Sequence, residues 1–250
     1  MTNRNNLLLS ITILLLTTVV VGIFGIVPFP EYETSLKKDL TGKIIYFSEI
    51  QSKNIIPPAP DIIDSCIYEI NLEAKPLSEK IIICQSDLSN YSYEIYFYDA
   101  QITNNNEVLI RYWSDSNNSE NILLINIETK QVSESNETLQ SRSNYKVNPQ
   151  GERILDYWEG RSPESRNVSL YYQKGNEVIE VFSEAAPTNY YFESSNWSQN
   201  GNNIVVLDSE GQIIIFSKNK TYQPIKIIYE KLQFSEQDDS RIVSIIGWSD

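Results

Sequence analysis

The residues that could carry out chemistry are few in this chain, and histidine is absent from all 250 positions. Histidine is the most common general base and the most common metal ligand. Neither a Ser-His-Asp nor a Cys-His arrangement can therefore be built from this chain alone. No G-x-S-x-G nucleophile turn occurs either. We predict no catalytic, cofactor-binding or metal-binding residues, and no intrinsic catalysis.

Carboxylate pairs are the remaining candidates for acid–base chemistry or calcium binding. Asp208 lies two positions before Glu210, and Asp238 is followed directly by Asp239. Neither pair has the ligand spacing of a calcium-binding loop. We interpret both pairs as solvated turn residues.

Two cysteines, Cys66 and Cys84, are the first and last residues of the stretch CIYEINLEAKPLSEKIIIC. Its midpoint, Lys75, lies in the expected turn EAKPLS, so the two cysteines face each other if the stretch forms a hairpin. Opposed residues on antiparallel strands are about 4.5–5.5 Å apart, within reach of a disulfide. We predict a disulfide, with two buried free thiols as the alternative. Two cysteines without histidine make a zinc site poorly supported.

The net charge of −13 restricts the classes of partner. Affinity for nucleic acid depends on lysines and arginines that neutralise phosphates, and the 20 such residues are scattered along the chain. The same balance argues against electrostatic docking on an anionic membrane. We predict no nucleic-acid partner.

An apolar run extends from Leu7 to Val27, and no charged residue occurs between Arg4 and Glu31. As a helix this run is about 31 Å long, which matches the hydrocarbon core of a bilayer. We predict a cytoplasmic tail at 1–6, a signal anchor at 7–28, a tether at 29–40 and an extracytoplasmic domain at 41–250. A cleaved signal peptide is the alternative.

A short unit of a turn followed by an apolar run recurs along the predicted domain. It occurs as NWSQNGNNIVVL at 196–207, NPQGERILDYW at 148–158, TNNNEVLIRYW at 103–113, TGKIIYF at 41–47 and, truncated, IIGWSD at 245–250. Glycine or asparagine occupies the turn, as a left-handed backbone requires. The predicted structural positions of the repeat are Gly42, Asn105, Gly151, Trp197, Gly201 and Trp248.

Each turn-plus-run unit is followed by a second short run rich in Ile, Val, Tyr and Leu, which is typical of antiparallel strands. The stretches NWSQNGNNIVVL and VNPQGERILDYW resemble the Trp-Ser-Pro-Asp-Gly-Lys-x-Ile motif of WD40-like, TolB-type propeller repeats. INIETKQ at 125–131 is similar to the Asp-x-x-Thr-Gly turn of that family. Asn200 and Gln150 replace the usual Asp, and Gln199 replaces the usual Pro. The resemblance implies an all-β, small β-propeller and envelope-associated interactions, and it carries over no site residues.

The order of the strands predicts how such a propeller closes. The domain starts at the second strand of a blade, KIIYF, and ends with a first strand, RIVSIIGW. The strand from about Arg241 would then complete the blade formed by residues 42–85. Three continuous blades would begin near Tyr93, Ser141 and Asn189, which makes about four in all. Five blades, or an incomplete ring closed by a partner, are the alternatives.

These features predict a single-pass membrane protein whose exported propeller is a scaffold for a protein or glycan partner. One alternative is a carboxylate-dependent enzyme acting on glycans. Another is an accessory propeller of a peptidase or sensor system. The sequence identifies neither the partner nor the oligomeric state.

Overall fold

A computed structural model describes residues 40–51, 62–74, 77–88, 94–103, 105–114, 118–136, 146–159, 166–186, 190–227 and 239–249. Almost all of these residues lie in strands or tight turns, and the helical element among them is a short 3-10 helix, η2 (Gln85–Leu88). The predicted signal anchor at 7–28 lies outside the described residues. Within those residues no helix has the length and hydropathy to cross a membrane.

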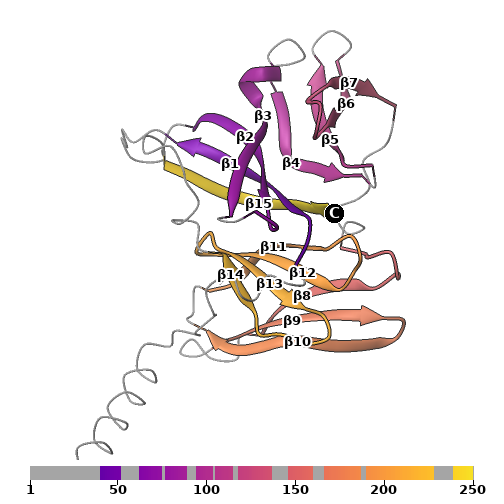
Figure 1. The fold of residues 1–250 in the computed structure, drawn as a ribbon, viewed down its shortest axis with the longest axis vertical. Coiled ribbons are helices and arrows are strands. Elements are labelled where there is room, and N and C mark those ends of the chain that lie inside the picture. Colours follow the sequence, from indigo (N-terminus) through magenta and orange to yellow (C-terminus); the bar gives the residue numbers. More distant parts are fainter. Residues whose placement is uncertain are drawn as a thin grey trace, which may run out of the picture.

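The described strands form four antiparallel sheets, three with four strands and one with three (Figure 1). The first sheet has the order β15 (Asp239–Ser249), β1 (Lys43–Gln51), β2 (Ile62–Asn71), β3 (Ser78–Cys84). The second has the order β4 (Glu94–Ile102), β5 (Glu107–Ser114), β6 (Ser119–Asn126), β7 (Val132–Ser135). The third comprises β8 (Arg153–Glu159), β9 (Arg166–Lys174), β10 (Glu177–Ala186). The fourth has the order β11 (Phe192–Trp197), β12 (Asn203–Asp208), β13 (Ile213–Ser217), β14 (Ile225–Ile227).

The first sheet joins the two ends of the described chain. β15 pairs with β1 along its whole length, from Lys43 opposite Ser249 to Gln51 opposite Asp239. In Figure 1 the yellow β15 lies beside the indigo β1 and ends at the label C. The predicted closure by a shared C-terminal strand is therefore confirmed. Such pairing protects the edge of β1, which would otherwise present unpaired backbone groups.

Two of the predicted starting points for continuous sheets also agree with the structure. β4 begins next to Tyr93, and β11 begins shortly after Asn189. The third starting point, Ser141, lies outside the described residues. In that region the structure describes only an isolated bridge between Val147 and Arg153, beside the three-stranded sheet.

Three hydrophobic cores hold the sheets together, and each lies between two of them. One joins the first and fourth sheets, one the first and second, and one the third and fourth. Alternate residues of the central strands supply different cores: Val205 and Leu207 face the first sheet, whereas Ile204 and Val206 face the third. Successive side chains of a strand point to opposite faces. This explains why β12 reads as a continuous apolar run.

In each sheet a left-handed residue lies shortly before one strand, namely β1, β5, β8 or β12. Gly42, Gly151 and Gly201 have φ of 89°, 75° and 68°. In the second sheet the residue with positive φ is Asn106, at 57°, and not Asn105 as the sequence comparison predicted. This turn leads from Ile102 to its partner Val108, whereas the turn at Gly201 leads from Trp197 to Ile204 and is one residue longer. An ungapped comparison therefore places the left-handed position one residue too early.

Candidate functional site: a central hollow between the first strands

The first strands of the sheets lie against one another, although they are far apart in the sequence. β15 contacts both β4 and β11. The side-chain amide of Asn196 donates to the carbonyl of Ile246 over 2.9 Å, and Ser194 Oγ accepts the N–H of Ile245 over 2.9 Å. Gly247 lies so close to β4 that a Cβ atom there would overlap the side chain of Ile102. The first strands therefore form one packed unit.

A hollow of about 380 Å³ opens between these strands, and we call it the central hollow. Its walls come from β4, from Lys146, from β11 and from β15. The polar residues in these walls are Lys146, Glu193, Ser194, Ser195, Asn196 and Ser244. The central hollow thus offers hydroxyl, amide and charged groups together, which is the mixture that hydrogen-bonds a polar ligand.

A second hollow, of about 330 Å³, lies where the first strands end. All four repeat units contribute to it, with Ile102 and Thr103, Val147 to Pro149, Asn196 to Gln199, and Trp248. Asn196 lines both hollows. Three equivalent turns and the end of β15 therefore meet around one opening.

The two repeat tryptophans predicted as structural residues are buried beside this opening. The indole N–H of Trp197 donates to the carbonyl of Lys146 over 2.8 Å, and that of Trp248 donates to the carbonyl of Thr41 over 2.9 Å. Each tryptophan thereby ties two segments that are distant in sequence. Because their N–H groups are used within the protein, we assign these tryptophans to packing.

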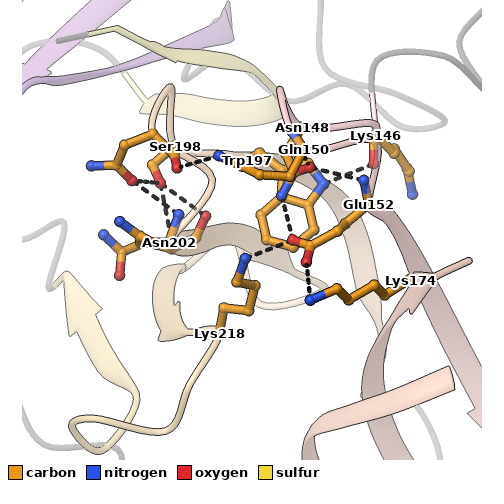
Figure 2. Close-up of polar contacts among 11 residues, drawn as sticks. Lys146, Asn148, Gln150, Glu152, Lys174, Trp197, Ser198, Asn202 and Lys218 are labelled. Atoms are coloured by element: carbon orange, nitrogen blue, oxygen red, sulfur yellow. Dashed lines mark hydrogen bonds and ion pairs between the residues drawn. The ribbon is translucent and has the colours of Figure 1, made fainter. Parts of the chain in front are cut away.

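A charged cluster, shown in Figure 2, joins the third and fourth sheets next to the second hollow. The carboxylate of Glu152 accepts from Lys218 Nζ over 2.6 Å and from Asn148 Nδ2 over 2.7 Å, with Lys174 Nζ 4.0 Å away. The side chains of Lys218 and Glu152 are only 11% and 4% exposed. The Lys218 ammonium also lies 5.7 Å from the ring centre of Tyr172 and 5.8 Å from that of Trp197. Such contacts stabilise a buried cation.

Burial acts against the charge on Glu152, and its partners act for it. Desolvation raises the pKa of the Glu152 carboxyl. The hydrogen bonds from Lys218 and Asn148 and the positive charges of Lys218 and Lys174 lower that pKa, and together they outweigh desolvation. The net result is a pKa below its ordinary value of 4.5. Glu152 is therefore ionised at neutral pH and is not poised to exchange a proton.

Sequence reasoning missed this pair because the two residues are 66 positions apart. The backbone N–H of Lys218 donates to the carbonyl of Asn202, as the N–H of Leu72 donates to Gly42 and that of Ile127 donates to Asn106. Lys218 thus occupies the position that two other sheets fill with a buried aliphatic residue. In the sequence, a lysine at a repeat position that is otherwise aliphatic was the signal that could have indicated a buried ion pair.

The turns around Glu152 are rigid because their polar groups bond to one another. Asn148 Oδ1 accepts the N–H groups of Gln150 and Glu152, and Ser198 Oγ accepts the N–H of Asn203. A Cβ atom at Gly201 would overlap the Gln150 side chain. Gly201 therefore meets two requirements, a left-handed backbone and a close approach of two turns.

The carboxylate pairs noted in the sequence have different environments. Asp208 was interpreted as solvated, and this is wrong, because its side chain is buried. Its Oδ1 accepts the N–H groups of Glu210 and Gln212, and its Oδ2 accepts the hydroxyl of Tyr190 over 3.1 Å. Burial raises the pKa of Asp208 above its ordinary value despite these bonds. Glu210 is largely exposed, as expected; Asp238 lies outside the described residues.

The cysteines form the disulfide that the hairpin register predicts, with Cys66 directly opposite Cys84. Among the described residues, Asp64, Cys66 and Cys84 make a close group of potential metal ligands. A metal-binding cysteine must be a thiolate, and both sulfurs are instead bonded to each other. This group therefore does not fit a metal ion.

A comparison with models of protein families gives no match, and a comparison with curated proteins gives none either.

Proposed function

We propose that the four sheets are the blades of a small β-propeller, and that the protein is a membrane-anchored, extracytoplasmic binding scaffold. Three features support the architecture: four sheets of similar strand order, first strands in mutual contact, and a C-terminal strand that completes the N-terminal sheet. The turn motifs that resemble TolB-type repeats are consistent with it. The described inner strands of the proposed blades are β15, β4 and β11.

The central hollow is the observation that carries the binding role. All four units contribute to it or to the adjoining second hollow, so it depends on the complete domain. Hydroxyl groups such as those of Ser194 and Ser244 are suited to hydrogen-bonding a peptide loop or a glycan. The partner class that fits is therefore a polar protein segment or sugar.

The two buried carboxylates Glu152 and Asp208 do not favour a catalytic role. Glu152 is held by Lys218 and Asn148, and Asp208 is held by turn N–H groups and Tyr190. General acid–base catalysis needs a group that can exchange a proton near the working pH and that reaches the substrate. Neither Glu152 nor Asp208 lines the central hollow.

The disulfide supports a location outside the cytoplasm, since such bonds persist in oxidising surroundings. The apolar run at 7–28 supplies the proposed anchor. The partner would then be met on the outer side of the membrane.

The binding role can be tested by site-specific photo-crosslinking in whole cells. A photoreactive residue replaces Ser244, in the central hollow, or Ser133, an exposed residue of β7 that serves as the matched control. We expect an adduct of defined mass at Ser244 and not at Ser133, with the added mass identifying a peptide or a glycan. The same adducts at both positions, or none at Ser244, would contradict binding in the central hollow.

A further inference from the structure

The left-handed residues that precede β1, β5, β8 and β12 all lie at one end of the sheets, which we call the turn end. Gly42, Asn106, Gly151 and Gly201 mark it, and the hairpins β6–β7 and β13–β14 return there as well. The other end, which we call the far end, carries the starts of β2, β4, β11 and β15 and the hairpin between β12 and β13. Along β1 the two ends are about 30 Å apart.

The chain enters the domain at the turn end. Leu40 is buried in the core that joins the first and fourth sheets, which also contains Trp248. Thr41 is fixed because its carbonyl accepts the indole N–H of Trp248 over 2.9 Å. The described part of the chain therefore begins at this end of the domain and not at the far end.

We propose that the turn end faces the membrane and that the far end faces outward. This inference rests on the proposed anchor at 7–28. The tether at 29–40 can extend to about 40 Å at most. The lipid surface is thus the neighbour of the turn end, and the far end is the part of the domain that aqueous partners meet first.

The charges of the two ends are consistent with this orientation. Acidic and basic residues balance at the turn end, and several form ion pairs: Lys43–Glu69, Lys80–Glu69, Lys174–Glu152, Lys218–Glu152 and Lys220–Glu180. Lys226 is one of the few basic residues in the described part of the far end. Acidic residues dominate there: Glu49, Asp64, Asp87, Glu184 and Glu210.

Anionic lipids repel negative charge within a Debye length, which is about 10 Å at 0.1 M salt. An orientation with the far end toward the bilayer would place its acidic groups in that field. The turn end carries no comparable excess of negative charge. The position of Leu40 and the distribution of charge are separate observations, and both favour the same orientation.

Two glutamates provide a matched pair of labelling sites. Glu128 lies in the β6–β7 turn at the turn end, and Glu210 lies in the β12–β13 turn at the far end. Both are exposed, and the N–H of each donates to a side-chain oxygen two positions earlier, Asn126 and Asp208 respectively. Glu128→Cys and Glu210→Cys therefore remove the same charge from the same kind of turn. The native cysteines are joined in the disulfide, so they do not compete for the label.

The experiment uses the full chain reconstituted in phosphatidylcholine vesicles, with and without phosphatidylglycerol. A fluorophore on either new cysteine donates energy to an acceptor on the lipid headgroups. We expect clearly higher transfer from E128C than from E210C in both lipid mixtures, and a difference that does not shrink when anionic lipid is added. Equal transfer, or higher transfer from E210C, would overturn the proposed orientation.

Flotation of the same vesicles separates the two proposals. If the protein does not float with the lipid, the anchor fails, and the orientation fails with it. If the protein floats but the two labels give equal or reversed transfer, only the orientation is wrong. A melting temperature measured for each labelled variant checks that the domain remains folded.

Discussion

At the scale of single residues, the least expected feature is the buried ion pair between Glu152 and Lys218. Removing two charges from water is costly, and their attraction compensates only when the remaining polar groups are also satisfied. Asn148, Lys174 and the rings of Tyr172 and Trp197 provide that satisfaction. The pair therefore holds the third and fourth sheets in a defined arrangement more than it adds net stability.

Replacing one member of the pair should be far more harmful than replacing both. Lys218→Leu leaves the Glu152 carboxylate buried without its main partner, and we expect a loss of about 3 kcal/mol in the free energy of unfolding. Adding Glu152→Leu should recover much of this loss, because aliphatic residues already occupy the Lys218 position in two other sheets. Urea unfolding of the two single variants and the double variant measures the coupling. Additive losses would show that the pair is not energetically linked.

The low pKa of Glu152 predicts an acid-dependent loss of stability. A carboxyl whose pKa is lower in the folded than in the unfolded state stabilises the fold above the unfolded value, here about 4.5, and this contribution is lost as pH falls through the folded pKa. The raised pKa of Asp208 changes stability with pH in the opposite direction. The contribution of Glu152 must therefore be isolated by comparing the wild type with Glu152→Gln. We expect the stability advantage of the wild type over Glu152→Gln to decrease as the pH is lowered from 5 to 3. Parallel curves for the two proteins would contradict this assignment.

At the scale of the elements, β15 both pairs with β1 and contacts β4. A strand that lacks a side chain at one position allows close approach of a neighbour. Gly247 provides that position, opposite Ile102 of β4. The second sheet is thereby fixed against the C-terminal strand, although their residues are more than a hundred positions apart.

A double-mutant cycle tests this contact. Gly247→Ala introduces a methyl group into the space of Ile102, and we expect it to destabilise the protein by about 1–3 kcal/mol. In the background of Ile102→Ala the same change should cost little, because the overlapping atoms are gone. Thermal and urea unfolding of the four proteins give the coupling energy. An equal cost in both backgrounds would mean that the strands do not approach as described.

At the scale of the whole molecule, the two ends of the described chain meet in one sheet, and three cores link the four sheets in the order third, fourth, first, second. The first and fourth sheets each contribute to two of these cores. Loss of β15 would therefore expose the edge of β1 and remove residues from two cores at once. We expect the domain to unfold as a unit and not sheet by sheet.

Circular permutation distinguishes the position of the chain ends from the presence of β15. For residues 40–250, a short glycine-rich link from Ser249 back to Leu40, with new ends at the exposed turn of Gly175, should preserve a cooperative unfolding transition. Truncation after Asp238 should abolish that transition, because it removes β15 completely. The unpermuted fragment is the reference, measured by circular dichroism against urea. A truncated protein that unfolds cooperatively at a similar urea concentration would contradict the role given to β15.

Several features of the fold could be predicted from the sequence. Local chemistry predicted the antiparallel strands, the left-handed glycines, the tryptophan positions and the register that unites Cys66 with Cys84. It failed at Asn105, because this turn is one residue shorter than the turn at Gly201, and at Asp208, whose burial depends on Tyr190 and its surroundings. The second error concerns a feature that neighbouring residues alone do not encode.

The sequence by itself determined an all-β chain with a shared closing strand, a histidine-free composition and an apolar run near its start. These properties follow from alternation, turn chemistry and residue type, which are local. Only the tertiary structure decided that Lys218 meets Glu152, that Gly247 meets Ile102 and that the first strands enclose a hollow. Those contacts depend on how four sheets pack against one another. Packing is set by the complementarity of many distant side chains together, and no short segment records it.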